Sequence, residues 1–526
     1  MSLLHKIREG VWTGTAAMVV EYALKIPRMM VMTRFLSPEL YGLLSLFGMF
    51  RTIVGQFVQF GSGDAVIKFL SSGKAGNERE QMSATMGAAG IIRTATMAVL
   101  LVATILFEDQ IAIWLRTYPA LAVLDRTELL WIIRLLLAGV AIQAAEGPLG
   151  NALQGFQAWR TLLVVRIVSA LATTILPAAA VLLGFRLVGV VAAQQASFLV
   201  VAVMIFISYR RKVAPLLRRV RFAEAWRATP RVFRFGFPLV LSSFFQTLYN
   251  YTDQVMLTGM GKMAQELSYY SAGMSLASFI GVVPVLMRNV MFPAASEYGQ
   301  TREIERLEAL LRFMAKHFFW LLLPVAFWGA ALSNEILLLI SGAAYLPAAP
   351  VLGWLAVSRV LVGLGTAVFI CLVGALGRTR EQFFVSASVG LLNLGLNYLL
   401  ISRHGYMGAV WATCICRVVG LTLGTYILSR YMRVRPPLRA MGVCLALSLP
   451  LSGGLYAAHL ALGLFALPLV LPAALVYGYG IVRLGVFDSQ DVEYLERVLG
   501  RFHSRIGGML AFLRRNSAPV AAEYRV

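Results

Sequence analysis

Basic side chains inside long apolar stretches are the residues of this sequence best suited to chemistry. A charged group at mid-bilayer costs roughly 2.5–3.5 kcal/mol on insertion scales, so it faces a protein interior or a wet cavity. The forked donors of arginine suit phosphate. We therefore predict a cationic cavity for a phosphate-bearing anion; for any single arginine, a structural hydrogen bond or a snorkelling position is the alternative. The predicted cavity residues are Lys25, Arg28, Arg51, Arg93, Arg288, Arg359 and Arg417.

Two isolated acids accompany these cations inside apolar stretches. Glu146 shares a helix face with Gln143 and Gly150, and Asp253 shares one with Asn250, because residues three and four apart lie on the same side of a helix. Acids in such positions often relay protons or bind sodium. We predict that Glu146 and Asp253 couple the protein to an ion gradient, with salt bridges to the cavity arginines as the alternative.

A proline lies among the first charges of the chain. Pro27 stands between Lys25 and Arg28 in the apolar stretch 10–34. Proline removes a backbone donor and kinks a helix. The sequence therefore predicts a hinge at Pro27, although a static kink explains the same pattern.

Motifs of enzyme chemistry are missing from the sequence. It contains no GxxxxGK[ST], no HExxH, no GxSxG and no cysteine–histidine cluster with metal-ligand spacing. The four cysteines, Cys371, Cys414, Cys416 and Cys444, fall in apolar stretches and predict buried thiols. We expect no enzyme activity, no metal and no cofactor.

The amino-acid composition indicates that these charged residues lie on membrane-spanning helices. The chain has 526 residues, of which 59% are hydrophobic and 14% charged, and its mean hydropathy is +0.74. A soluble protein carries about 25% charged residues. The fold class is therefore all-α: a polytopic membrane protein of about 14 helices, with 12 as the competing count. The predicted spans are 10–34, 41–69, 84–107, 129–155, 161–183, 187–207, 236–259, 268–293, 313–333, 349–375, 383–402, 408–429, 441–462 and 464–483.

The distribution of basic residues predicts the sidedness of the chain. With the N-terminus inside, the predicted cytoplasmic segments hold 30 of the 47 Lys and Arg residues, and the outer segments hold 5. This asymmetry follows the positive-inside rule and places both termini in the cytoplasm. The net charge of +22 then reflects topology, and we expect no nucleic-acid partner. The basic segment 208–235 and the amphipathic pattern of 488–515 predict contact with the anionic inner leaflet and its lipids, with simple topology anchors as the alternative.

An internal repeat predicts two pseudo-symmetric six-helix lobes plus two C-terminal helices. The stretches 151–193 and 374–413 share a pattern of span end, Gly-containing turn, span and Gly-Val-rich span, about 220 residues apart. Transporters built from parallel repeats place their substrate between the halves. The predicted divisions are an N-lobe at 1–207, a basic linker at 208–235, a C-lobe at 236–430, two added helices at 441–483 and a cytoplasmic amphipathic tail at 484–526.

Several stretches resemble one membrane-protein family. The runs RFLSPELYGLLSLF (34–47) and GSGDAVIKFL (61–70) are similar to polysaccharide-unit flippases of the multidrug/oligosaccharidyl-lipid/polysaccharide exporter superfamily. YTDQVMLTGM (251–260), ELSYYSAGMSL (266–276) and ISGAAYLPAAPVLGWLA (340–356) agree with the second half of that pattern. The resemblance covers most of residues 1–430. It implies alternating access, and a polyprenyl-pyrophosphate-linked anionic oligosaccharide moved from the inner to the outer leaflet of a bacterial cytoplasmic membrane.

The resemblance leaves other functions open. A peptidoglycan lipid II flippase and a drug/cation antiporter of the same superfamily are the nearest alternatives, although the DAF-type and EGA-type motifs of lipid II flippases are not found after spans 1 and 2. A membrane glycosyltransferase or ligase acting on the same carrier is the alternative from another class. The implied partners are the lipid-linked oligosaccharide, membrane lipids and the polysaccharide polymerase or glycosyltransferase machinery.

Overall fold

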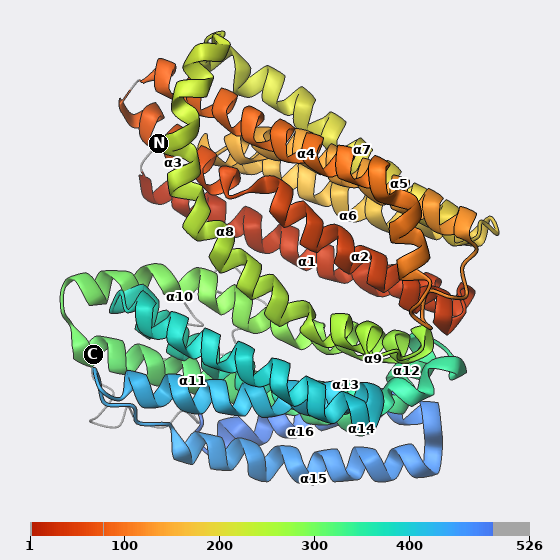
Figure 1. The fold of residues 1–526 in the computed structure, drawn as a ribbon. Coiled ribbons are helices and arrows are strands. Elements are labelled where there is room, and N and C mark those ends of the chain that lie inside the picture. The colour runs from red at the N-terminus through yellow and green to blue at the C-terminus, as the bar shows by residue number, and fades with distance from the viewer. Residues whose placement is uncertain (1–2, 77, 488–526) are drawn as a thin grey trace. The chain divides into compact units, whose positions relative to one another are not determined.

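Helices make up the regular structure of the described chain (Figure 1). The computed structural model describes residues 3–76 and 78–487, so the predicted amphipathic stretch 488–515 lies outside the described residues. The α-helices are α1 (Leu3–Phe35), α2 (Pro38–Gln59), α3 (Ser62–Gly76), α4 (Arg79–Leu115), α5 (Arg126–Gly155), α6 (Trp159–Leu182), α7 (Leu187–Lys212), α8 (Phe222–Gly259), α9 (Ala264–Ala277), α10 (Val282–Gln300), α11 (Ile304–Ala331), α12 (Ser333–Ile340), α13 (Ala349–Phe369), α14 (Thr379–Leu428), α15 (Leu438–Leu462) and α16 (Val470–Arg483). Short 3₁₀ segments are η1 (Ala214–Leu216), η2 (Ser278–Gly281), η3 (Ala343–Ala348) and η5 (Gly463–Leu469), and η4 (Ile370–Ala375) is a π-helix.

The chain forms two compact units. The first contains Met1–Ser271 and Asn397–Tyr406, and the second contains Ala272–Leu396 and Met407–Val526. In the first unit, α1 packs on α6, α5 packs on α6 and α7, and the short helix α3 lies against α4, α5 and α8. In the second unit, α11 packs on α13 and α15, and α10 packs on η4. The predicted lobe boundaries at 208–235 and 430–441 stay predictions.

The described residues include ten candidate membrane spans, which makes the chain a multi-pass membrane protein. Two of these candidates, Thr379–Leu428 with 50 residues and Leu438–Arg483 with 46, are each long enough for two crossings, since about 20 residues suffice for one. Helix α1, which carries Glu21 and three basic residues from Lys25 to Arg34, is not among the ten. The all-α polytopic fold is confirmed, and the count of fourteen stays a prediction.

Apolar surfaces support the membrane assignment. Large hydrophobic side chains such as Val99, Leu106, Leu391 and Leu475 are exposed on the long helices. Exposed apolar side chains are unfavourable in water but favourable in lipid. Lipid also requires that every backbone N–H and C=O group is hydrogen-bonded within the protein. Helices close their own backbone hydrogen bonds, which is why this composition folds as helices.

Two glycine breaks lie where the sequence predicts turns between spans. Gly405 has φ +56° and interrupts α14 between the predicted spans 383–402 and 408–429. Gly463 has φ +55° and ends α15 between the spans 441–462 and 464–483. A side chain at either position would be strained, because the left-handed region favours glycine.

The predicted span 41–69 is wrong as a single helix. It consists of α2, which ends at Gln59, and α3, which begins at Ser62. Phe60 (φ +43°) and Gly61 (φ +64°) turn the backbone between them. A Cβ at Gly61 would lie 2.3 Å from the carbonyl oxygen of Gly236, so α8 approaches too closely for a side chain. Gly61-Ser62-Gly63-Asp64 is a local turn signal that the span prediction overlooks. The break places the first turn of α3 beside α4 and α5.

Candidate functional site

Arg93 lies at the centre of a polar cluster in the first unit. Helix α4 carries it into the contact with α3 and α5, where the residue is only 2% exposed. Its Nε donates to Ser62 Oγ over 2.8 Å, and its Nη1 donates to the carbonyl oxygen of Ala144 over 3.5 Å. A Cβ at Gly147 would lie 1.9 Å from Nη1. Gly147 therefore provides the space that the guanidinium group occupies.

Glu146 supplies a negative charge to the same cluster. It precedes Gly147 on α5, and its carboxylate interacts electrostatically with Arg93 and Arg51. Its Oε2 atom is buried and accepts no hydrogen bond within the described part of the chain, and Arg93 Nη2 likewise donates none there. A buried polar atom without a partner costs about 1–3 kcal/mol. The cluster therefore keeps donor and acceptor capacity for a ligand or water.

Arg51 brings a second guanidinium group from α2. Its Nη1 donates to Gln143 Oε1 over 3.2 Å, and its Cζ lies 4.1 Å from the centre of the Phe198 ring. Gly55 admits the Gln143 side chain, since a Cβ there would lie 2.8 Å from Oε1. Arg51 also interacts electrostatically with Arg28 on α1.

These contacts define an arginine cluster in the first unit, with three cations and one acid. The structure brings together four of the predicted site residues. They are Arg28, Arg51, Arg93 and Glu146.

Lys25 and Pro27 are placed on α1, which runs without interruption from Leu3 to Phe35. The Lys25 Nζ lies 5.7 Å from the centre of the Tyr22 ring. Pro27 is exposed. The predicted hinge therefore falls inside a continuous helix, and hinge motion stays a prediction.

Asp253 forms a separate buried centre in the first unit. Tyr270 Oη donates to Asp253 Oδ2, and Asn397 Nδ2 donates to Oδ1 over 2.6 Å. All three residues are at most 4% exposed. Asn397 follows Asn393 by four residues, so the two asparagines share a helix face. Tyr270 carries no such signal, because its role depends on how α9 packs beside α8. Two hydrogen bonds hold the carboxylate in place.

Three predicted cavity residues belong to the second unit. Arg359 Nη2 lies 3.5 Å from Met274 Sδ, with Gly281 nearby. Arg417 donates to Ser358 Oγ, and its Nη1 donates to the carbonyl oxygen of Leu355 over 3.4 Å, so it joins α14 to α13. Arg288 is exposed on α10. That these three line one cavity with the arginine cluster stays a prediction.

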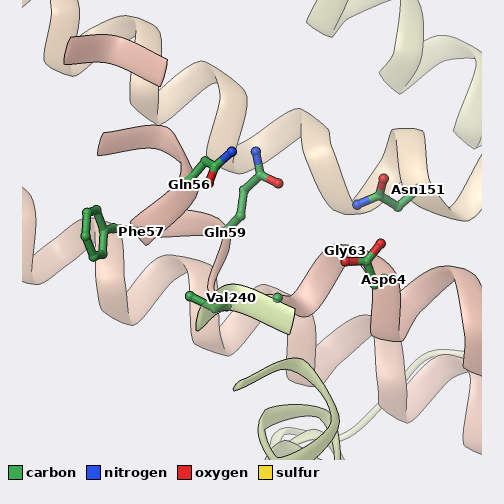
Figure 2. A pocket seen from close by; sticks show the side chains of 8 residues that line it. Gln56, Phe57, Gln59, Gly63, Asp64, Asn151 and Val240 are labelled. Atoms are coloured by element: carbon green, nitrogen blue, oxygen red, sulfur yellow. The ribbon is translucent and has the colours of Figure 1, made fainter. Parts of the chain in front are cut away.

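A polar pocket of about 160 Å³ adjoins the arginine cluster in the first unit. Figure 2 shows Gln56 and Gln59 side by side on α2, and Asn151 directed from α5 toward Gly63 and Asp64 on α3. A Cβ at Gly63 would lie 2.5 Å from Asn151 Nδ2 and 3.5 Å from Arg93 Nη2, so Gly63 separates the pocket from Arg93. The cavity predicted from charged residues misses this pocket, whose polar lining is mainly carboxamide.

The described side chains provide no metal centre. No group of three or more His, Cys, Asp or Glu residues with suitable geometry occurs among them. The four cysteines are free thiols, of which Cys371, Cys416 and Cys444 are buried as predicted. The prediction is wrong for Cys414, which is only half-buried.

Known proteins share this fold and part of this sequence. A probable low-salt glycan biosynthesis flippase, Agl15 of Haloferax volcanii, is 23% identical over 245 residues, which are 47% of this chain and 51% of that protein. The chain thus matches about half the length of that curated relative.

Two solved structures superimpose on most of the chain. The lipid II flippase MurJ in an inward closed conformation gives a TM-score of 0.69 at 15% identity, covering 88% of this chain and 96% of MurJ. An inward-facing multidrug resistance MATE family transporter of the MOP superfamily gives 0.64 at 16% identity, covering 79% and 98%. These identities establish similarity of fold. The predicted resemblance is confirmed by the family model that matches residues 7–299, and the chain belongs to the polysaccharide biosynthesis protein family.

Proposed function

We propose that this protein is a transporter that moves a polyprenyl-pyrophosphate-linked oligosaccharide from the inner to the outer leaflet of a bacterial cytoplasmic membrane. The observation that carries the proposal is the arginine cluster: Arg51 and Arg93 are held among membrane helices, each with a buried guanidinium nitrogen that donates no hydrogen bond to the described residues. A pyrophosphate group accepts from such forked donors. Family membership supports a role in polysaccharide synthesis.

The proposed mechanism is alternating access between two lobes, at 1–207 and 236–430, with both termini in the cytoplasm. The cluster binds the pyrophosphate, which lowers the cost of moving its charge through the bilayer. Lys25, Arg288, Arg359 and Arg417 are proposed to contact the substrate at other stages of the cycle. Arg417 differs from the two cluster arginines. It donates hydrogen bonds to residues of the second unit, whereas Arg51 and Arg93 each keep a guanidinium nitrogen that donates none to the described residues.

Ion coupling is proposed to use Asp253 and Glu146. Asp253 is buried, and its carboxylate accepts hydrogen bonds from Tyr270 and Asn397, which hold it in one position. Carboxylates inside transporter helices are groups that bind a proton or a sodium ion. Glu146 differs, since Arg51 and Arg93 already interact with it.

Reconstituted vesicles test the proposed function against its alternatives. Purified protein is placed in liposomes that contain a fluorescent polyprenyl-pyrophosphate oligosaccharide, lipid II or a cationic dye, and transfer is followed with an impermeant quencher. We expect rapid transfer of the oligosaccharide lipid, with little movement of the dye. Faster transfer of lipid II would instead support the function of MurJ, whose fold the chain shares.

A further inference from the structure

The pocket beside the arginine cluster has the chemistry of a sugar-binding site. Its polar side chains are the carboxamides of Gln56, Gln59 and Asn151 and the carboxylate of Asp64. Carboxamides both donate and accept hydrogen bonds, and a carboxylate accepts them. Groups of this kind match hydroxyls, which also donate and accept. Gln56 Oε1 is buried and accepts no hydrogen bond in the part of the chain that the structure describes, so the pocket contains an acceptor ready for a ligand.

Charge around the pocket disfavours ions of either sign. No Lys or Arg is among its lining residues, and Asp64 would repel a second anion placed there. A metal cation would meet the nearby guanidinium group of Arg93, whose Nη2 lies 3.5 Å from the position of a Cβ at Gly63. A neutral ligand rich in hydroxyl groups avoids both penalties.

The size of the pocket corresponds to one ring. Its volume is about 160 Å³, and a cavity of about 150 Å³ accepts a ring such as benzene. The pocket is therefore too small for an oligosaccharide and suits a single pyranose unit, with the remaining sugars outside it.

The backbone break between α2 and α3 creates the pocket. The turn at Phe60 and Gly61 ends one helix and starts another, so Gln56 and Gln59 from the first meet Gly63 and Asp64 from the second (Figure 2). Discontinuous membrane helices are common at transporter binding sites, since they expose polar groups away from lipid. Gly63 has no side chain, and the Asn151 carboxamide fills part of that space.

We infer that this pocket binds the first, uncharged sugar of the transported lipid, next to the arginine cluster that binds its pyrophosphate. The inference rests on the proposed function, because it assigns a second part of the same substrate. A sugar attached directly to a phosphate is joined to it through one bridging oxygen, which matches two sites separated by a single glycine. Asp64 then selects a neutral sugar over a uronic acid.

Binding of three defined lipids to the full chain in nanodiscs tests the inference. The probes are a short polyprenyl pyrophosphate, the same lipid carrying one glucose and the same lipid carrying one glucuronic acid. We expect the wild-type protein to bind the glucose lipid about tenfold more tightly than the bare lipid. A tenfold gain in affinity corresponds to the free energy of one or two hydrogen bonds. Glucuronic acid should give no such gain. Equal affinity for glucose-bearing and bare lipid would overturn the inference while the affinity for bare lipid still supports the proposed function; binding of no probe would overturn both.

Variants separate sugar contact from structure. Gln56→Ala and Asn151→Ala should each remove most of the tenfold gain from glucose and leave the affinity for bare lipid unchanged. Gln265→Ala, which removes a carboxamide bonded to Tyr269 elsewhere in the unit, is the matched control and should change neither affinity. The near-isosteric Asp64→Asn should raise the affinity for glucuronic acid lipid about tenfold. Equal loss for glucose-bearing and bare lipid in the alanine variants, with no gain in Asp64→Asn, would show that these side chains do not contact the sugar.

Discussion

Gly147 leaves room for the Arg93 guanidinium group: a Cβ at Gly147 would lie 1.9 Å from Arg93 Nη1. A contact so short is impossible for real atoms, so any side chain at residue 147 displaces the arginine. Arg93 is a flexible side chain, and its displacement leaves the backbone of α5 intact. This pair of residues therefore allows the arginine cluster to be disturbed without changing any of its charges.

Gly147→Ala should reduce transport at least tenfold while the protein still inserts and folds. The physical reason is that Arg93 moves away from Ser62 and Glu146, which removes its positioned donors. Transport rate in vesicles and the midpoint of thermal unfolding are the measurements. Gly150→Ala on the same helix is the matched control, since a Cβ there meets only Ile205 Cδ1 at 3.7 Å. Equal transport by the two alanine variants would contradict the proposed role of Arg93.

Arg93→Ala should destabilise the fold by about 1–3 kcal/mol, because it removes the hydrogen bond to Ser62 and leaves the half-buried Glu146 carboxylate with Arg51 as its cationic neighbour. The double variant Arg93→Ala/Glu146→Gln should recover much of that loss and remain inactive in transport. Unfolding measured for both single variants and the double variant gives the coupling free energy. Additive losses would mean that Arg93 and Glu146 do not interact.

Asp253→Asn should remove the dependence of transport on an ion gradient. The substitution nearly keeps the shape of the side chain but eliminates its charge, so a proton or sodium ion no longer gains by binding. Initial transport rates with and without imposed sodium and proton gradients check this expectation. Asp109→Asn is the control, because that acid forms an exposed ion pair with Arg126. Retained gradient dependence in Asp253→Asn would leave the acid with a structural role.

Pro27→Ala should slow transport while substrate binding is largely kept. The substitution restores a backbone donor inside α1 and stiffens the helix, which biases the protein toward one facing state. The measurement is the accessibility of single cysteines from each side of the membrane. Unchanged cysteine accessibility together with full transport would show that Pro27 has a packing role and is not a hinge.

Charge inside an apolar run is costly, so charged residues there are visible in the sequence. Arg51, Arg93 and Glu146 are all found this way, and the structure brings them together. The breaks at Gly405 and Gly463 are also predicted, since each follows a complete span. The charged residues and the two glycine breaks are local features, so they can be recognised in a single sequence.

Features that depend on packing between distant segments escape the sequence. The turn at Gly61 has a local signal in Gly61-Ser62-Gly63-Asp64, which the span prediction overlooks, whereas the close approach of Gly236 is not visible in the sequence. Tyr270 becomes a partner of Asp253 only when α9 lies beside α8. Gln56 and Asn151 are neutral, so their presence in a membrane helix costs less than that of an arginine and gives a weaker signal.

The proposed pyrophosphate site is tested most directly by comparing transfer of the oligosaccharide lipid by Arg51→Ala and Arg93→Ala with transfer by Arg134→Ala in the same vesicles. Arg134 is a matched control, because it lies in the same unit but forms an exposed ion pair with Glu108. If the arginine cluster binds the pyrophosphate, both cluster variants lose transport at equal reconstituted amounts, whereas Arg134→Ala keeps the wild-type rate. Wild-type rates in Arg51→Ala and Arg93→Ala would contradict the claim that the arginine cluster binds the transported pyrophosphate.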